Sequence, residues 1–203
     1  MAFADPVTLA GALVTLEPLD HAHHDALVAA ASDGELWKLW YTSVPAPDEM
    51  RGHIDAALEQ QRQGSVLPFA IRSARSGAIV GSTRFLNIDA ANRRLEIGAT
   101  WHAAGAQRTG INRETKLLLL AHAFDTLDCI AVEFRTHWMN HASRAAIAAL
   151  GARQDGVLHN HRILPDGSLR DTVVFSIIAS EWPAVRQHLH HQLARYGGAS
   201  GSC

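Results

Sequence analysis

The sequence predicts a single α/β domain with a central mixed, mostly antiparallel sheet flanked by helices. Segments in which apolar and polar residues alternate, as in strands, occur between segments whose apolar residues repeat at helical spacing. Several strand segments follow one another through short turns rich in Gly, Asn and Asp, which favours antiparallel pairing. With 203 residues, 47% of them hydrophobic and 19% charged, the chain is long enough for one buried core and short for two domains.

The first half of the chain is expected to contain two helices and four or five strands. Residues 7–17 alternate between apolar and polar side chains, which predicts a bent strand or a short hairpin. Asp20 is expected to cap a helix over residues 21–32, and Asp48 begins a second helix to about residue 63. Strands are expected over residues 67–72, 79–89 and 95–102.

The second half is expected to alternate helices with strands. Apolar residues at helical spacing predict a helix over residues 113–127. Further helices are expected over residues 142–150 and 181–196, and strands over residues 129–136, 153–163 and 172–178. Gly151 is expected to end one helix in the left-handed conformation, and Pro165-Asp166-Gly167 to form a hairpin turn. We therefore expect one domain over residues 1–196 and a flexible Gly/Ser tail over residues 197–203.

Composition excludes several classes of protein. The formal net charge of −2 gives no basic field for a phosphate polymer, so no nucleic-acid partner is expected. The amino-terminal residues lack a basic segment and are interrupted by Asp5, Pro6 and Glu17, which predicts neither a signal peptide nor a membrane span. The two cysteines, Cys129 and Cys203, predict no disulfide framework and fit a reducing compartment. We expect a cytoplasmic protein without a membrane partner.

A small-residue loop followed by a leucine-rich helix, GAQRTGINRETKLLLL over residues 105–120, has the features of an anion site. The first turn of a helix has backbone N–H groups without partners, and these attract phosphate. Gly110 can take a positive φ, Asn112 can cap the helix and Arg108 adds a positive charge. The loop lacks the Walker pattern and the dinucleotide glycine triplet. Taken alone, it fits an ordinary helix start equally well.

Longer motifs identify a family. The loop QRTGIN resembles the Gln/Arg-x-x-Gly-x-Gly/Ala pyrophosphate loop of the GCN5-related N-acetyltransferases (GNAT), although Asn112 and Ala104 depart from the usual Gly/Ala and Pro. The segments LEIGATW, INRETKLLLLAHAFDTL, RTHWMNHASRAAIAALGARQDGVL and LPDGSLRDTVVFSIIASEW resemble the branch that contains the RimJ/RimL-type ribosomal-protein-alanine N-acetyltransferases. The resemblance covers about residues 7–193. It implies the GNAT fold, with a sheet that is splayed where acetyl-CoA binds, and acetyl-CoA as cosubstrate.

The same resemblance implies a set of coenzyme-binding residues. These are Trp101, His102, Gln107, Arg108, Thr109, Gly110, Ile111, Asn112, Asn140 and Ser143. In similar enzymes the strand that ends in Trp101 and His102 holds the pantetheine arm and directs an N–H at the thioester oxygen. Asn140 would bind the pantetheine amides, and Ser143 would lie near the sulfur and protonate the thiolate. The alternative for Asn140 is that it only caps a helix.

Two carboxylates are candidate bases. Glu96 points away from Leu95 and Ile97 on its strand, and in relatives that position faces the acceptor cleft. There it could accept the ammonium proton through water; the alternative is a surface ion pair with Arg93 or Arg94. Asp171 is a second candidate base or acceptor ligand, and its alternative is a structural hydrogen bond or a pair with the neighbouring arginine.

Histidine and aromatic side chains are candidates for the acceptor side. His159 and His161 alternate along a strand, so we expect them to share a face that could line the acceptor cleft or bind a metal. No carboxylate or cysteine completes a zinc spacing, so no metal is expected. Trp37, Trp40 and Tyr41 could form a lid, and the alternative is core packing. The acceptor-binding candidates are Trp37, Tyr41, His159 and Asp171.

The function expected from these residues is N-acetyl transfer, with Ser143 and Glu96 as the catalytic side chains. The acetyl group of acetyl-CoA would move to a primary amine, either a protein N-terminal α-amine or a small molecule, by direct attack in a ternary complex. The alternative is a non-catalytic coenzyme A binding or sensing module with the same fold. A monomer and a homodimer are both compatible with the sequence.

Overall fold

The computed structural model describes residue 3, residues 5–42 and residues 44–197. The described residues form an eight-stranded sheet in the order β1-β2-β3-β4-β5-β6-β8-β7. The strands are β1 (Leu9–Ala10), β2 (Val14–Pro18), β3 (Leu67–Ser73), β4 (Ile79–Asp89), β5 (Arg94–His102), β6 (Ala131–His137), β7 (Arg153–Ile163) and β8 (Leu169–Ile178). The helices are α1 (His24–Ser32), α2 (Met50–Arg62), α3 (Ile111–Ala121), α4 (His141–Ala148) and α5 (Trp182–Gly197). Apart from Gly197, the expected tail lies outside the described residues.

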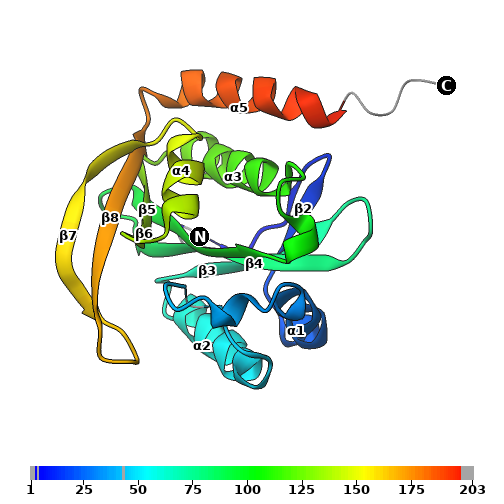
Figure 1. Cartoon of the computed structure of the whole chain (residues 1–203). Coiled ribbons are helices and arrows are strands. Elements are labelled where there is room, and N and C mark those ends of the chain that lie inside the picture. Colours follow the sequence, from blue (N-terminus) through cyan, green and yellow to red (C-terminus); the bar gives the residue numbers. More distant parts are fainter. Residues whose placement is uncertain (1–2, 4, 43, 198–203) are drawn as a thin grey trace.

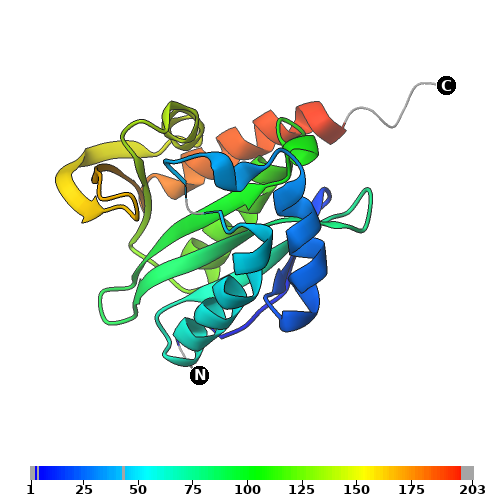
Figure 2. The same cartoon turned by 60° about the horizontal axis from the view of Figure 1, so that its bottom comes forward.

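The sheet has helices on both faces. Helices α1 and α2 cover one face, while α3, α4 and α5 lie on the other (Figures 1 and 2). The largest fully buried side chains come from both layers and the sheet between them, and include Leu27, Ile54, Phe69, Phe85 and Leu119. No described helix is long and apolar enough to cross a membrane.

The sheet is mostly antiparallel and splits in the middle. Only β5 and β6 run parallel, and they pair over three positions, the last being Glu96 opposite Glu133. Beyond that pair β5 continues toward His102 without pairing to β6. A bulge marks the same stretch, because the β4–β5 register shifts there and Ala99 has a φ of 47°. The predicted mixed, mostly antiparallel and splayed sheet is therefore confirmed.

Helix α3 begins two residues earlier than the sequence predicts. Gly110, with a φ of 89°, is the N-cap residue, and Ile111 is the first residue of the helix. The expectation that Asn112 caps the helix is corrected, because the positive φ of Gly110 turns the chain directly into the first turn. A Cβ at Gly110 would lie 2.9 Å from the ring of Tyr196 on α5, so a side chain is also excluded by packing. A π-helical turn over His122–Thr126 ends this element.

Several local predictions are confirmed in detail. Asp20 caps the turn that leads into α1, through the backbone N–H of Ala22 at 2.8 Å. Gly151 follows α4 with a φ of 98°, and the turn before β8 is a hairpin turn in which Gly167 has a φ of 81°. Residues 7–17 form the β1–β2 hairpin. Its turn is held by the buried Glu114 carboxylate of α3, which accepts three backbone N–H bonds from residues 12–14.

Candidate active site

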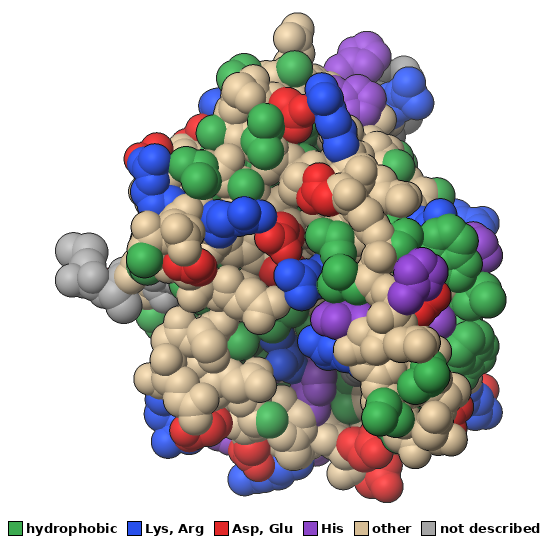
Figure 3. All heavy atoms as spheres, turned by 90° about the vertical axis from the view of Figure 1, so that its left-hand side faces the viewer, with side chains coloured by type: hydrophobic (Ala, Val, Ile, Leu, Met, Phe, Trp, Pro, Cys, Tyr) green, Lys and Arg blue, Asp and Glu red, His purple; other side chains and the backbone are tan. Residues whose placement is uncertain are grey.

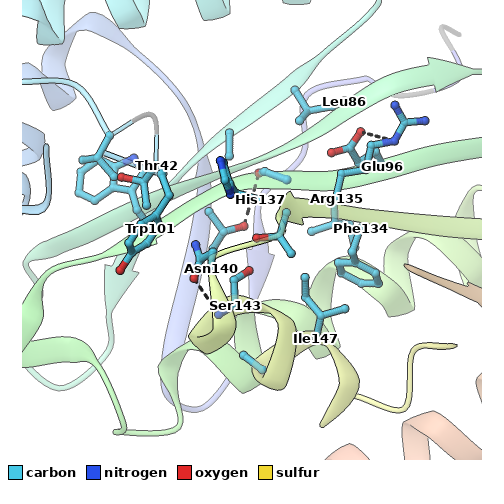
Figure 4. Close-up of a pocket in the computed structure, with 18 of the residues that line it drawn as sticks. Thr42, Leu86, Glu96, Trp101, Phe134, Arg135, His137, Asn140, Ser143 and Ile147 are labelled. Carbon is cyan, nitrogen blue, oxygen red and sulfur yellow. Dashed lines mark hydrogen bonds and ion pairs between the residues drawn. The ribbon is translucent and has the colours of Figure 1, made fainter. Parts of the chain in front are cut away.

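One cavity of about 700 Å³ occupies the split in the sheet. Its walls are the β5 bulge, the starts of α3 and α4, the segment after α1, and the β7–β8 hairpin (Figure 4). The sequence-predicted residues that line it are Tyr41, Glu96, Trp101, His102, Gln107, Arg108, Asn112, Asn140 and Ser143. Those that do not line it are Trp37, Thr109, Gly110, Ile111, His159 and Asp171. The cavity thus brings Glu96 and Tyr41 together with most of the expected coenzyme-binding residues.

The start of α3 forms one end of the cavity. The backbone N–H groups of its first turn have no acceptor within the helix, and Arg108 stands beside them in an exposed position. Gln107 is held by a hydrogen bond from its Nε2 to the carbonyl of His102, 3.2 Å long. The Thr109 hydroxyl donates to the carbonyl of Ala106, and Ile111 is buried in the core. Thr109 and Ile111 therefore shape the loop, while Arg108 and Asn112 face the cavity.

The open side of β5 fits an extended, amide-bearing ligand. Residues 97–102 are paired with β4 on one side, whereas their pairing with β6 has ended. Two buried ring nitrogens at this edge, Nε1 of Trp101 and Nε2 of His102, have no hydrogen-bond partner among the described residues. Burial lowers the pKa of His102 to about 3, so this imidazole is neutral. Together with the first turn of α3, these groups fit a pantetheine arm followed by a diphosphate.

Asn140 and Ser143 lie together at the start of α4 (Figure 4). Oδ1 of Asn140 accepts a hydrogen bond from the backbone N–H of Ser143 at 3.0 Å, so Asn140 does cap the helix. The amide Nδ2 of Asn140 makes no hydrogen bond to a described residue. The hydroxyl of Ser143 is likewise without a described partner, and both residues line the cavity. The capping role therefore leaves the donor of Asn140 and the hydroxyl of Ser143 available to a ligand.

Glu96 is a buried carboxylate on the opposite wall. Its Oε2 accepts a hydrogen bond from Nδ2 of Asn87 at 2.8 Å and lies 3.6 Å from Nε of Arg135 (Figure 4). Burial raises the pKa of Glu96, and the positive charge of Arg135 opposes that rise in part. A Cβ at Gly98 would lie 2.9 Å from its Oε1, so the glycine makes room for the carboxylate over β5.

The structure does not show the alternative for Glu96, a surface ion pair with Arg93 or Arg94. Arg93 pairs with Asp128, and Arg94 pairs with Glu133 at 2.6 Å. Glu96 is 7% exposed and turned into the cavity, so it does not reach either arginine. The carboxylate that the sequence allowed on the surface is a group of the cavity wall.

Three acceptor-side expectations are corrected. Trp37 packs against the hydrophobic core and does not line the cavity, whereas Tyr41 does. Asp171 accepts hydrogen bonds from the backbone N–H of Asn160 at 2.7 Å and from Nδ1 of His159 at 3.0 Å, which is the structural alternative. His161 bonds instead to Thr172, the next residue along β8, so it faces the side opposite to His159.

The reason that the two histidines separate is a break in the strand. Asn160 has a φ of 48°, and the β7–β8 register shifts between Leu158 and Arg162. His161 consequently lines the cavity, and His159 stays outside it, 80% exposed at its side chain. No group of three or more His, Cys, Asp or Glu side chains in the described part of the chain could hold a metal ion.

The sequence reasoning missed Lys116. This lysine on α3 is buried and lines the cavity, where its Nζ donates a hydrogen bond to Oγ1 of Thr100 on β5 at 2.6 Å. Nζ also lies 5.9 Å from the centre of the Phe134 ring on β6. Burial lowers the pKa of Lys116 to about 7. Its position was detectable, since Leu119, Leu120 and Ala123 follow it at helical spacing on the buried face.

A second missed group lies beside α2. His53 lines the cavity and accepts a hydrogen bond from the guanidinium of Arg84 on β4. Burial, together with the charge of Arg84, lowers the pKa of His53 to about 4, so the imidazole is neutral and can accept. Arg84 is itself buried and has no carboxylate partner among the described residues. The sequence did not indicate this pair, because the two residues are 31 positions apart and meet only in the folded chain.

Comparison with known proteins agrees with the fold. The model of the acetyltransferase (GNAT) domain matches residues 14–153. A GCN5-related N-acetyltransferase from Brucella melitensis is 30% identical with a TM-score of 0.85, covering 97% of this chain and 90% of that chain. RimJ of Mycobacterium smegmatis, in complex with a coenzyme A disulfide, is 26% identical with a TM-score of 0.76, covering 95% of each chain. No curated protein matches the chain.

A more distant similarity concerns the fold alone. RimL, a ribosomal α-N-protein acetyltransferase in complex with coenzyme A, is 19% identical with a TM-score of 0.72, covering 85% of this chain and 98% of that chain. The chain belongs to the GNAT acetyltransferase family, and it is an acetyl-CoA-dependent acetyltransferase.

Proposed function

We propose that the chain transfers the acetyl group of acetyl-CoA to a primary amine by direct attack in a ternary complex. The observation that supports this most is the position of two groups on opposite walls of one cavity. Glu96, a buried carboxylate with a raised pKa, faces the cavity from β5, and Ser143, with a free hydroxyl, faces it from α4. Amine attack on a thioester needs a proton acceptor on one side and a proton donor on the other.

Each residue has a distinct role in this proposal. Glu96 accepts the proton of the ammonium, directly or through water. Its pKa is raised by burial, so it is a stronger base than an exposed carboxylate. Backbone N–H groups at the open edge of β5 polarise the thioester carbonyl. The Ser143 hydroxyl protonates the departing thiolate, and the amide of Asn140 holds the pantetheine arm. Arg108 and the first turn of α3 bind the diphosphate.

The acceptor side of the cavity is separate from the coenzyme side. It is bordered by Tyr41 and Thr42 in the segment after α1, by His53 on α2, and by His161 and Arg170 on the β7–β8 hairpin. Tyr41 packs edge-on against Trp40, whose ring also contacts His137 with centroids 5.1 Å apart. In this proposal, these side chains border the path of an amine that approaches Glu96.

The test is an acetylation screen. Purified protein is mixed with acetyl-CoA and a panel of small amines and amino-terminal peptides; thiol release and mass spectrometry of the products are measured. We expect at least one acceptor to gain one acetyl group with matched thiol release. Coenzyme A should stabilise the fold by about 2.7 kcal/mol at 100 times its dissociation constant. Such stabilisation without thiol release across the whole panel would favour a non-catalytic binding module instead.

A further inference from the structure

The acceptor half of the cavity carries an excess of positive charge. Among the described residues that line the cavity, Glu96 is the one carboxylate, whereas four arginines and one lysine line it. Arg108 lies at the coenzyme end and Lys116 lies at the fork of the sheet. The remaining arginines, Arg135, Arg162 and Arg170, all lie on the acceptor side, on strands β6, β7 and β8.

Arg135 is already neutralised, and the other two are not. Arg135 lies between two carboxylates, 2.9 Å from Glu133 and 3.6 Å from Glu96. No described carboxylate lies within ion-pair distance of Arg162 or Arg170. Nε of Arg170 donates to the hydroxyl of Thr172 at 3.1 Å, and this is its one described hydrogen bond. Two guanidiniums therefore face the cavity with most of their donors unused.

The two unpaired arginines lie directly opposite each other. Arg162 on β7 and Arg170 on β8 are register partners in an antiparallel pair, so their side chains leave the same face of the hairpin. Like charges in this arrangement repel and destabilise a sheet. Arg170 is also half-buried; burial and then the charge of Arg162 lower its pKa, while the charge of Glu96 opposes part of that shift. The arrangement carries a cost in the protein alone, which an anion between the two would remove.

The neighbouring histidines add no charge to this wall. His161 and His137 line the same wall, and in both cases burial lowers the pKa, with the charges of nearby arginines adding to the effect. They are therefore neutral at pH 7. Figure 3, which views the molecule from the β7–β8 side, shows Lys/Arg and His side chains gathered around a hollow on this face.

We propose that the acceptor amine carries an anionic group, and that Arg162 and Arg170 bind this group while the amine faces Glu96. This inference rests on the proposed acetyl transfer and names its substrate class. A carboxylate or a phosphate matches the planar donor fork of arginine and can bridge two guanidiniums. Glu96 attracts the ammonium end, so the wall presents opposite charges to the two ends of one acceptor.

The anionic group could belong to a small amine or to the first residue of a peptide, and the experiment distinguishes the two. The first source is a small amine, represented by β-alanine against its amide and by phosphoethanolamine against ethanolamine. The second is the acidic first residue of a peptide, represented by peptides that begin with Asp against those that begin with Asn. For each pair we compare kcat/KM of the wild type with that of Arg170→Gln and Arg162→Gln. The control is Arg62→Gln, an exposed arginine on α2 outside the cavity.

We expect the wild type to favour the anionic member of at least one pair by about ten- to a hundredfold, the effect of one charged hydrogen bond. Arg170→Gln should reduce that preference to about threefold or less, mainly through a higher KM of the anionic acceptor, with a smaller change for the neutral acceptor. Arg62→Gln should keep the full preference. The two amines of a pair also differ in basicity. We therefore compare the ratio of kcat/KM for the anionic and the neutral acceptor in the wild type with the same ratio in each variant.

Equal use of charged and neutral acceptors by the wild type would overturn the inference and leave acetyl transfer intact. So would an anionic preference that survives both substitutions. A protein that acetylates no amine would contradict the proposed function, and the subsite is then tested by binding. Thermal stabilisation of the coenzyme A complex by β-alanine or phosphoethanolamine should be present in wild type and Arg62→Gln and absent in Arg170→Gln. Stabilisation that is equal in all three, or absent in all three, would overturn the subsite.

Discussion

Lys116 donates a hydrogen bond from Nζ to Oγ1 of Thr100, 2.6 Å away, at the point where the sheet divides. The Thr100 hydroxyl also lies 2.7 Å from that of Thr83 on β4. From α3, the buried Lys116 side chain therefore contacts both strands at the split: β5 through Thr100 and β6 through the Phe134 ring. The residue thus connects α3 to both strands that border the split in the sheet.

Replacing this lysine should stabilise the protein. Its folded pKa, about 7, lies below the ordinary lysine value of 10.5, so the unfolded chain binds more protons between these pH values. The free energy of unfolding therefore rises with pH from about 7 to 10.5. Lys116→Met should be more stable at pH 7 by about 2–4 kcal/mol, and its slope over that window should be smaller. Urea unfolding at several pH values measures both.

The control for this substitution is Lys38→Met. Lys38 is an exposed lysine that pairs with Glu35, so its removal should leave the slope between pH 7 and 10.5 as in the wild type. If Lys116→Met and Lys38→Met gave the same slope, the buried amine would not be the group that titrates.

Glu96 should set the acid limb of the pH–rate profile. Burial raises its pKa, so kcat/KM should fall as the pH drops through that raised value and the carboxylate takes up a proton. Glu96→Gln should lower kcat by about a hundredfold or more and remove this limb. Glu133→Gln, which removes the neighbouring carboxylate outside the cavity, should keep the limb. If the acid limb were unchanged in Glu96→Gln, a group other than Glu96 would be the base.

Ser143→Ala should separate turnover from coenzyme binding. We expect kcat to fall about tenfold or more, since the alanine cannot protonate the thiolate. The dissociation constant of coenzyme A should change by about threefold or less, because one neutral hydrogen bond contributes little net affinity. Calorimetric titration and steady-state rates measure the two quantities. Equal losses in both would mean that Ser143 binds the coenzyme without acting on the sulfur.

Asn140→Asp should distinguish capping from ligand binding. Aspartate caps helices as well as asparagine, so the bond to the Ser143 N–H is kept and the melting temperature should stay within about 2 °C. The amide donor is lost, so coenzyme affinity should fall about tenfold. Asn140→Ala removes both groups and should also cost about 1 kcal/mol of stability. Unchanged affinity in Asn140→Asp would make the residue a cap alone.

The sequence predicted the order and type of nearly every element because each carries its own local signal. The β-branched run of β8, the hairpin turn before it and the Asp20 cap depend on neighbouring residues only. The start of α3 was misplaced by two residues because Gly110 and Asn112 are both plausible caps, and packing against Tyr196 on α5 selects the glycine position.

The site was predicted less completely, because most of its wall depends on contacts between distant elements. The motif residues Arg108, Asn140 and Glu96 line the cavity as expected. Arg162 and Arg170 lie on either side of a turn, and only the strand register shows that they share a face. His159 lies outside the cavity because of a bulge in β7, which the alternation of apolar and polar residues in the sequence does not reveal.

The packing of Tyr196 against Gly110 has a consequence for the far end of the molecule. Helix α5 leaves the β7–β8 half of the sheet and returns across α3, so its last turn braces the loop where the diphosphate is proposed to bind (Figure 1). Helix α5 therefore connects the β7–β8 half of the sheet to the start of α3. Removal of that last turn would leave Glu96, Asn140 and Ser143 in the chain, and we expect it to weaken the proposed binding of the coenzyme diphosphate.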